Sequence, residues 1–334
     1  MLRKLLLFLA LALVGGYLWY AHALSAIGDG ETRKIVKIPK GASMQSIATQ
    51  LKEEGVIRSA RAFSLYVRLH GEDSSLQAGS FVLRLSQSVS EIVETLTTGA
   101  SEEISLTIPE GYTVKDIDAL VAGEGLAETG AILTCAQTCD FSSFEFLPPR
   151  TDMAKRGGKI EGYLYPDTYY VSPADFHPKF FLERLLTTFR HRVVEEKKAA
   201  IDGSDRSLHA IITMASLIEE ETRKAGERPI VSGILWKRFD NGIGLGVDAA
   251  VRYILEKPSS AITLDDLEVD SPYNLRKYRG LPPGPIASPS LSSIEAALAP
   301  EESKYLYYLH GTDGVIRYAE TNDEHNENKK KYLR

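Results

Sequence analysis

The residues best suited to chemistry are three glutamates in a row, Glu219–Glu221, which follow an apolar stretch. Apolar side chains recur before them at i, i+3, i+4 and i+7, which predicts a helix from His209 to Arg223 with one apolar face. A carboxyl at the boundary of such a face loses hydration, which favours its protonated form. A carboxylic acid that keeps its proton near neutral pH can act as a general acid.

Helical geometry separates the three glutamates. At about 100° per residue, Glu220 points away from the apolar face, where Lys224 is one turn further along. Glu219 and Glu221 lie on the two flanks of the face, and the periodicity does not choose between them. The alternative is a solvated helix end without a catalytic role, because charged residues commonly cover the outer side of a helix.

An internal repeat precedes this helix. Val36–Leu51 and Leu106–Val121 share a strand, a turn of Ile, Pro, a charged residue and Gly, and an amphipathic helix. Ser43 and Thr113 stand where a side chain can cap each helix. Gly79–Leu96 repeats the strand, polar turn and helix once more. These units resemble LysM-like modules, which are often associated with glycan binding, and a spacer or docking module is the alternative.

Further elements follow the glutamates. The sequence predicts helices over Ile230–Asp240 and Ser292–Ala299 and a hairpin over Lys304–Ala319. The intervening segment Ser271–Pro289 is too rich in Pro and Gly for regular structure. Irregular segments of this length inside a domain are often functional.

The N-terminus predicts export. Leu5–Tyr20 has no charge, and its apolar character fades beyond, close to the ~20 residues that span a bilayer. Arg3 and Lys4 would stay in the cytoplasm by the positive-inside rule, and the rest of the chain would lie outside. The sequence Ala21–Ala23 also has the form of a signal-peptide cleavage site, so a cleaved signal is the alternative. Both interpretations export the chain.

Composition excludes some classes of function. The chain has 334 residues, a formal net charge of −6 and no basic stripe, which argues against a nucleic-acid partner. The two cysteines, Cys135 and Cys139, are too few for a metal site, and no cofactor motif is present. Outside the cytoplasm a disulfide between them is permitted, but spacing alone does not establish one.

Six motifs, taken in order, resemble the YceG/MltG family of endolytic murein transglycosylases. They are EGYLYPDTYY (161–170), ASLIEEET (215–222), LGVDAAVRY (245–253), SPYN (271–274), GLPPGPIASP (280–289) and YLYYLHGTDGVIRYAETNDEHN (305–326). The resemblance implies an α+β protein with an N-terminal transmembrane helix (1–24), a linker (25–35), a LysM-like α+β region (36–121) and a mixed α+β catalytic domain (122–334). It implies one crossing of the bacterial inner membrane, with the catalytic domain in the periplasm.

The resemblance also implies a reaction. Members of this family cleave the MurNAc-GlcNAc β-1,4 bond inside nascent glycan strands and leave 1,6-anhydroMurNAc ends. The first acid of the family's motif is catalytic, and that position is Glu219 here. A hydrolase needs a second carboxylate, whereas a lytic transglycosylase uses the C6 hydroxyl of the sugar, whose tethering supplies effective concentration. Glu219 would act first as general acid and then as base, with no metal or cofactor.

The motifs supply further candidates for substrate binding. These are Glu161, Asp167, Glu221, Asp248, Tyr273 and Asn274. One motif departs from the family pattern, because Gly246 stands where an amide side chain is usual and Ala249 where Pro is usual. Any substrate contact from that amide is therefore absent here, which weakens the case for Asp248.

Two other functions are compatible with the sequence. One is a non-catalytic peptidoglycan-binding scaffold, favoured by the LysM-like units and by Gly246. The other is a glycan hydrolase that uses water, with Glu219 assisted by Glu161, Glu221 or Asp248. The partners expected in all cases are peptidoglycan strands and the membrane, and the family resemblance adds peptidoglycan synthases.

Overall fold

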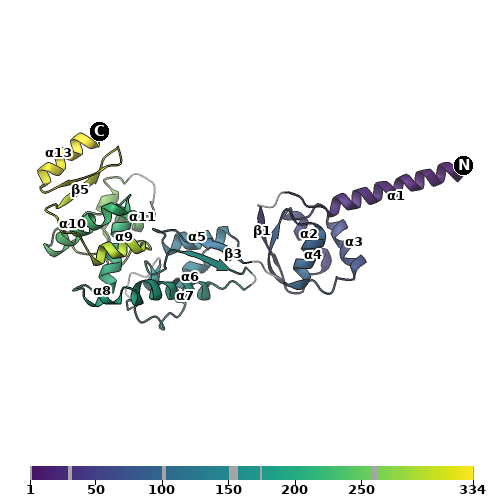
Figure 1. The fold of residues 1–334 in the computed structure, drawn as a ribbon, viewed down its shortest axis with the longest axis horizontal. Coiled ribbons are helices and arrows are strands. Elements are labelled where there is room, and N and C mark those ends of the chain that lie inside the picture. The colour runs from purple at the N-terminus through teal and green to yellow at the C-terminus, as the bar shows by residue number, and fades with distance from the viewer. Residues whose placement is uncertain are drawn as a thin grey trace. The chain divides into compact units, whose positions relative to one another are not determined.

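The computed structural model describes six stretches of the chain and divides it into two compact units. The described residues are 2–28, 32–99, 103–149, 157–173, 175–257 and 262–333. Unit 1 comprises Met1–Leu106, Glu124–Leu126 and Tyr170–Phe176, and unit 2 comprises Thr107–Gly123, Ala127–Tyr169 and His177–Arg334. Figure 1 labels the elements in chain order, and each unit is described by itself.

The N-terminal helix α1 (Leu2–Leu24) is a candidate membrane anchor. Its segment Arg3–Leu24 has 22 residues and a mean hydropathy of 1.8, enough in length and composition to cross a bilayer. Large apolar side chains such as Phe8 and Trp19 are exposed along it. Exposed apolar surface of this extent is compatible with a membrane environment. The predicted helix is present.

Unit 1 is a small α+β module. Its elements after α1 are β1 (Arg33–Ile38), α2 (Met44–Glu53), α3 (Ala60–His70), β2 (Gly79–Arg84) and α4 (Val89–Thr98). Strands β1 and β2 are antiparallel, with Val36 opposite Phe81. Both side chains lie in one core with Leu51, Phe63 and Ile92 from the helices. Alternation along the strands and helical periodicity thus direct one face of every element inward.

The strand–turn–helix pattern recurs in β3 (Ile104–Thr107) and α5 (Val114–Gly123), as predicted. Gly41 and Gly111, in the matching turns, have φ of 77° and 78°, a conformation that glycine adopts easily. The copies continue alike, because α6 (Ala131–Thr138) follows α5 and β4 (Thr168–Val171) pairs with β3.

Local hydrogen bonds stabilise both copies, and the predicted domain boundary at residue 121 stays a prediction. The Ser43 side chain accepts from Ser46 N–H, and Thr113 exchanges hydrogen bonds with Asp116. Helix α5 packs on α6 and belongs to unit 2, because the division falls between Leu106 and Thr107. The likeness to LysM modules stays a prediction.

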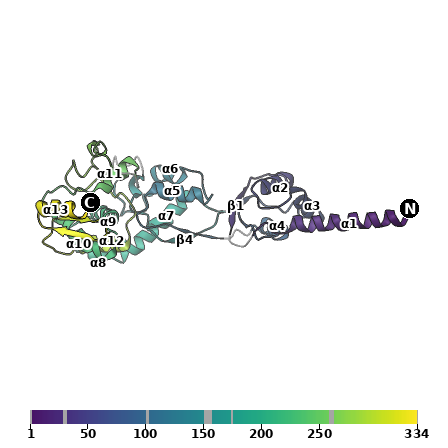
Figure 2. The same ribbon diagram turned by 90° about the horizontal axis from the view of Figure 1, so that it is seen from above.

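Unit 2 contains the acidic motif. Its remaining regular elements are α7 (Pro178–Phe189), a π-helical turn (Arg190–Glu195), α8 (Lys198–Asp202), α9 (Leu208–Glu221), α10 (Arg228–Asp240), α11 (Asp248–Leu255), α12 (Leu291–Leu298), β5 (Tyr307–His310), β6 (Ile316–Ala319) and α13 (Asn322–Tyr332), with short 3₁₀ turns at Gly158–Ile160, Ala225–Glu227 and Asp266–Glu268. Strands β5 and β6 form the predicted hairpin, and α13 packs beside it (Figures 1 and 2).

Helix α9 is the central helix of unit 2, and it is buried on more sides than the sequence predicts. Every residue from Ile211 to Ile218 is buried, including Thr213 and Ser216. Helices α10, α11 and α12 all pack against α9. Ser216 is accommodated because its hydroxyl donates to the Thr213 carbonyl and accepts from Ile286 N–H. The helix therefore emerges from the core at its two ends, and the three glutamates form the C-terminal one.

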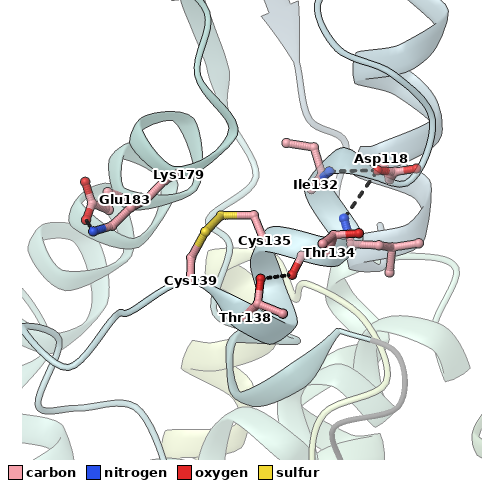
Figure 3. The surroundings of a disulfide bond; sticks show 9 residues. Asp118, Ile132, Thr134, Cys135, Thr138, Cys139, Lys179 and Glu183 are labelled. Atoms are coloured by element: carbon pink, nitrogen blue, oxygen red, sulfur yellow. Dashed lines mark hydrogen bonds and ion pairs between the residues drawn. A yellow bond between two sulfur atoms is a disulfide. The ribbon is translucent and has the colours of Figure 1, made fainter.

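The cysteines form a disulfide, a question that the sequence left open. Cys135 lies in the last turn of α6 and is bonded to Cys139, which follows that helix (Figure 3). The other end of α6 is held by Asp118, whose carboxylate accepts from the N–H groups of Gly130 and Ile132 at 2.7 and 2.9 Å. Both ends of α6 are thereby fixed.

Candidate active site

The carboxylate of Glu219 is held by both oxygens. Oε1 accepts from Nη2 of Arg228 at 2.8 Å, and Oε2 accepts from the backbone N–H of Ser290 at 2.9 Å. The Ser290 hydroxyl donates to Oε2 as well. The Glu219 side chain is 9% exposed, so the group is sheltered but open at the surface. These donors stabilise the ionised carboxylate and fix its plane.

The two donor residues stand at the starts of two helices. Arg228 opens α10, and Ser290 caps α12, where its side chain also accepts from Ser293 N–H. A second side chain of α12, Ser292, accepts from Arg228. The three helices that meet at Glu219 are thus joined by one hydrogen-bond network. Neither donor was identified from the sequence, although Ser290 stands at a recognisable cap position.

The irregular segment predicted from its Pro and Gly content connects this network to the turn of the second repeat. Ser288 N–H donates to the Tyr112 carbonyl at 2.9 Å, and Gly111 N–H donates to the Ser288 carbonyl at 2.8 Å. The same segment is attached to α9 through Ile286 and Ser216. The turn Ile108–Thr113 is therefore fixed near the end of α9.

This turn brings an acidic residue that sequence reasoning missed, Glu110. Burial around its carboxyl and the negative charge of Glu219 raise the pKa of Glu110, and the positive charge of Arg228 opposes that shift. Glu110 therefore lies in the electrostatic field of the Glu219–Arg228 pair. Aligning the two repeats could have identified Glu110, because the same turn position is basic in the first copy, where it is Lys40, and acidic in the second.

Glu220 is exposed, as predicted, but it is not isolated from the site. Its Oε1 lies 3.1 Å from the point that a Cβ on Gly111 would occupy. Loss of hydration around the carboxyl, together with the charges of Glu219 and Asp116, raises its pKa to about 7. Within the part of the chain that the structure describes, Glu220 makes no ion pair with Lys224.

Glu221 and Asp248 lie in a second polar cluster. The Tyr308 hydroxyl of β5 donates to Glu221 at 3.0 Å, and Arg276 binds both oxygens of Asp248. Burial raises the pKa of Glu221 to about 7, with a further contribution from the charge of Asp248, while the Tyr308 hydrogen bond lowers it. Glu221 thus attaches α9 to the hairpin.

Glu161 is buried, at 5% exposure, and joins three elements. It accepts from Val114 N–H at the start of α5 at 3.0 Å and from the Tyr253 hydroxyl of α11 at 3.1 Å. Burial raises its pKa to about 7, against these two hydrogen bonds. Glu161 lines a small pocket, and Tyr273 lines it too. The other lining residues are Pro148, Gly158, Lys159, Tyr163, His209, Tyr253, Gly284 and Pro285.

The last two predicted site residues, Asp167 and Asn274, make hydrogen bonds to backbone groups. Asp167 is exposed; its carboxylate accepts from Thr168 N–H at 2.7 Å, and its carbonyl accepts from Ile108 N–H at 2.9 Å. Asn274 is fully buried, at 0% exposure, and its amide donates to the carbonyls of Leu267 and Val269. The amide of Asn274 is therefore committed to its own loop, and direct contact with a substrate would require that loop to open.

At Gly246, where the sequence departs from the family pattern, the backbone adopts a conformation that favours glycine. Gly246 has a φ of 65° and donates its N–H to the Leu275 carbonyl at 3.1 Å. A side chain would resist this conformation.

In the part of the chain that the structure describes, no group of three or more His, Cys, Asp or Glu residues is arranged to hold a metal ion.

The site therefore consists of one anchored carboxylate with neighbours, and a separate small pocket. Glu219, Arg228 and Ser290 are in direct contact, and Glu110 and Glu220 lie in their field. Glu161 and Tyr273 come together at the pocket. One fixed carboxylate at the surface can transfer a proton to and from a bound molecule.

Comparison with known proteins places this arrangement in a family. The model of the YceG-like family matches residues 36–331. The endolytic murein transglycosylase of Bacillus subtilis (strain 168) is 33% identical over 96% of this chain and 91% of its own length. That of Streptococcus pneumoniae serotype 2 (strain D39 / NCTC 7466) is 30% identical over 97% of this chain, which spans 63% of the longer pneumococcal protein.

A solved structure agrees with these matches. The crystal structure of the putative yceG-like protein lmo1499 from Listeria monocytogenes superposes with a TM-score of 0.63 at 32% identity, covering 90% of this chain and 99% of that one. The match of the family over nearly the whole chain and the identity to full-length relatives lead to one conclusion: this chain belongs to the YceG-like family.

Proposed function

We propose that this protein is an endolytic murein transglycosylase, a lytic transglycosylase that cleaves the MurNAc-GlcNAc β-1,4 bond inside nascent glycan strands and leaves 1,6-anhydroMurNAc ends. Relatives named endolytic murein transglycosylase support the class of enzyme. The observation that carries the assignment of the acid is the anchoring of Glu219 through both oxygens by Arg228 and Ser290.

In the proposed reaction Glu219 gives up one proton and later takes up another, so it ends in its starting state. Protonated Glu219 gives its proton to the glycosidic oxygen as the bond from that oxygen to C1 of MurNAc breaks. The C6 hydroxyl of the same sugar then attacks C1, and the Glu219 carboxylate takes the hydroxyl proton. Arg228 and Ser290 stabilise the carboxylate between the two steps. Because the nucleophile is tethered, no water needs to be activated.

The residues predicted for substrate binding have different proposed roles. Glu161 and Tyr273 line the small pocket and are proposed to contact sugar there. Glu221, Asp248 and Asn274 keep the surrounding elements in place through Tyr308, Arg276 and the 267–269 backbone. A hydrolase using Glu161, Glu221 or Asp248 as second carboxylate is less favoured, because the groups that bind these carboxylates lie outside the network of Glu219, Arg228 and Ser290.

The proposed location follows from α1. Arg3 and Lys4 stay in the cytoplasm, α1 crosses the inner membrane once, and both compact units lie in the periplasm. Nascent glycan strands are made at that surface, so the proposed neighbours are peptidoglycan synthases. The matching repeats of strand, turn and helix are proposed to bind glycan in the manner of LysM modules.

Digestion of purified glycan strands by the full chain in detergent tests the proposal. Mass spectrometry should find fragments with 1,6-anhydroMurNAc ends, and Glu219→Gln should abolish their release. Fragments that carry only reducing ends would identify a hydrolase instead. Binding without release of fragments would identify a scaffold, and full activity of Glu219→Gln would exclude Glu219 as the acid.

A further inference from the structure

We infer that Glu110 is a second catalytic carboxylate, which faces the substrate beside Glu219 and stabilises the positive charge that develops on the sugar ring as the glycosidic bond breaks. This inference rests on the proposed transglycosylase activity. It goes beyond it, because the proposed reaction uses a single carboxylate for proton transfer and assigns nothing to the transition state at C1. Glycosyl transfer passes through an oxocarbenium-like transition state, which a nearby carboxylate stabilises.

The position of Glu110 is determined by backbone. Gly111, the next residue, and Tyr112 make the two reciprocal hydrogen bonds to Ser288, at 2.8 and 2.9 Å. Ser288 is two residues before Ser290, whose N–H and hydroxyl bind Glu219. The turn that carries Glu110 and the loop that holds the catalytic carboxylate are thus one connected structure. The backbone of the turn at Glu110 therefore cannot move away from the site without breaking these bonds.

The repeat indicates that the acid is not needed for the turn. In the first copy the corresponding residue is Lys40, and the following glycine has the same φ within a degree, 77° against 78° for Gly111. A turn of this shape therefore accepts either sign of charge. The carboxylate occurs in the copy that is bonded to the active-site loop, which favours a role in the site.

Glu110 is also less committed than the other acids. Glu161, Glu221 and Asp248 each accept a hydrogen bond or ion pair from protein, whereas the exposed Glu110 carboxyl makes no hydrogen bond to any described residue. Glu220 is the nearest alternative. It points away from the apolar face of α9, and with a pKa of about 7 its carboxyl is only partly ionised at neutral pH.

A pH dependence follows from the surroundings of Glu110. The charged and titratable groups that face it are Glu219 of α9, Arg228 of α10 and Tyr165, with Glu220 across Gly111. Burial and the charge of Glu219 raise its pKa, and Arg228 lowers it. Because the stabilising form is the carboxylate, activity should fall as the pH falls through this pKa. The fall should begin at a higher pH than for an ordinary glutamate.

Glu110→Gln in the full chain tests the inference, with defined glycan strands as substrate. We expect kcat to fall on the order of 100-fold, as for removal of one preorganised electrostatic group, with a smaller change in KM. The products should still carry anhydro ends, and the acidic limb due to this group should vanish from the pH profile. Glu110→Asp, which keeps the charge, should restore part of kcat.

Two variants serve as matched controls. Lys40→Gln changes the same turn position in the first copy, and Glu327→Gln removes an exposed carboxyl of α13; both should retain most of the wild-type kcat. Wild-type kcat in Glu110→Gln, or an equal loss in either control, would overturn the inference. Failure of the proposed function is recognised separately, because the wild type would then give no anhydro ends.

Discussion

Glu219 and Arg228 form an ion pair of 2.8 Å in which the carboxylate side chain is 9% and the guanidinium side chain 12% exposed. Such a pair is strongly oriented, because both partners are largely withdrawn from water. Arg228 also donates to Ser292, so its guanidinium fixes the carboxylate relative to α12. The pair therefore links the ends of three helices at the point where the proposed proton transfer occurs.

Replacing Arg228 should impair catalysis and stability together. In Arg228→Gln the Glu219 carboxylate loses its charged partner, and breaking a buried pair typically costs about 3–5 kcal/mol of unfolding free energy. We expect kcat to fall on the order of 100-fold, since the carboxylate formed after the first step loses its strongest donor. Calorimetry and single-turnover digestion measure the two effects. Arg192→Gln, which removes an exposed pair with Glu196, is the control and should change neither. Wild-type kcat in a folded Arg228→Gln would contradict the proposal.

Replacing Ser290 separates capping from catalysis. Ser290→Ala removes the hydroxyl that donates to Glu219 and that caps α12, but leaves the backbone N–H in place. We expect about 10-fold lower kcat, the equivalent of one hydrogen bond to a charged group. The lost cap should also lower stability by about 1 kcal/mol. Ser59→Ala removes the cap of α3 in unit 1 and should reproduce only the change in stability. Equal kcat in the two variants would show that the Ser290 hydroxyl does not assist Glu219.

Parts of this site could be predicted because their causes are local. The caps at Ser43 and Thr113, the turn glycines and the hairpin over β5 and β6 depend on residues a few positions apart. The flanking positions of Glu219 and Glu221 follow from helical geometry. Choosing Glu219 needed the family resemblance, since both flanks carry a glutamate.

Other parts could not be predicted because they depend on tertiary contacts. Ser290 is 71 residues from Glu219 in sequence, and only the fold brings it to the carboxylate. The periodicity of α9 indicates one apolar face, whereas Thr213 and Ser216 are buried as well. The burial of Ser216 is possible because its hydroxyl is satisfied inside the core. Asn274 matched a family motif, but its amide binds its own loop.

The contact between Tyr308 and Glu221 should matter for stability more than for chemistry. Tyr308→Phe leaves the half-buried Glu221 carboxylate without its donor, which typically costs about 1 kcal/mol. The Tyr308 hydrogen bond lowers the pKa of Glu221, so its loss should raise that pKa above the present value of about 7. Thermal unfolding at neutral pH measures the loss. Tyr307→Phe on the same strand is the control, and an equal change in both variants would remove the hydrogen bond as the cause.

Glu161 should make stability depend on pH in a defined window. Burial raises its pKa from 4.5 to about 7 in the folded protein. Between these values the folded state keeps a proton that the unfolded state has released, so stability falls as the pH rises. This contribution amounts to about 3 kcal/mol, is fully present below pH 4.5 and is lost above about pH 7. Glu161→Gln mimics the protonated side chain: its amide oxygen keeps an acceptor for Val114 N–H, and its amide NH₂ can donate to the Tyr253 hydroxyl.

The variant therefore isolates this one titration. The difference in unfolding free energy between Glu161→Gln and the wild type should grow from pH 4.5 to pH 7 and then stay constant, with the variant the more stable at the upper end. Titrating the full chain in detergent over this range measures it, because the shared titrations of Glu220 and Glu221 cancel in the difference. Asp167→Asn, at an exposed carboxylate, should show no such trend. A constant difference for Glu161→Gln across the range would mean that Glu161 carries its charge in the folded protein, and that the links from the pocket to α5 and α11 are made by a carboxylate.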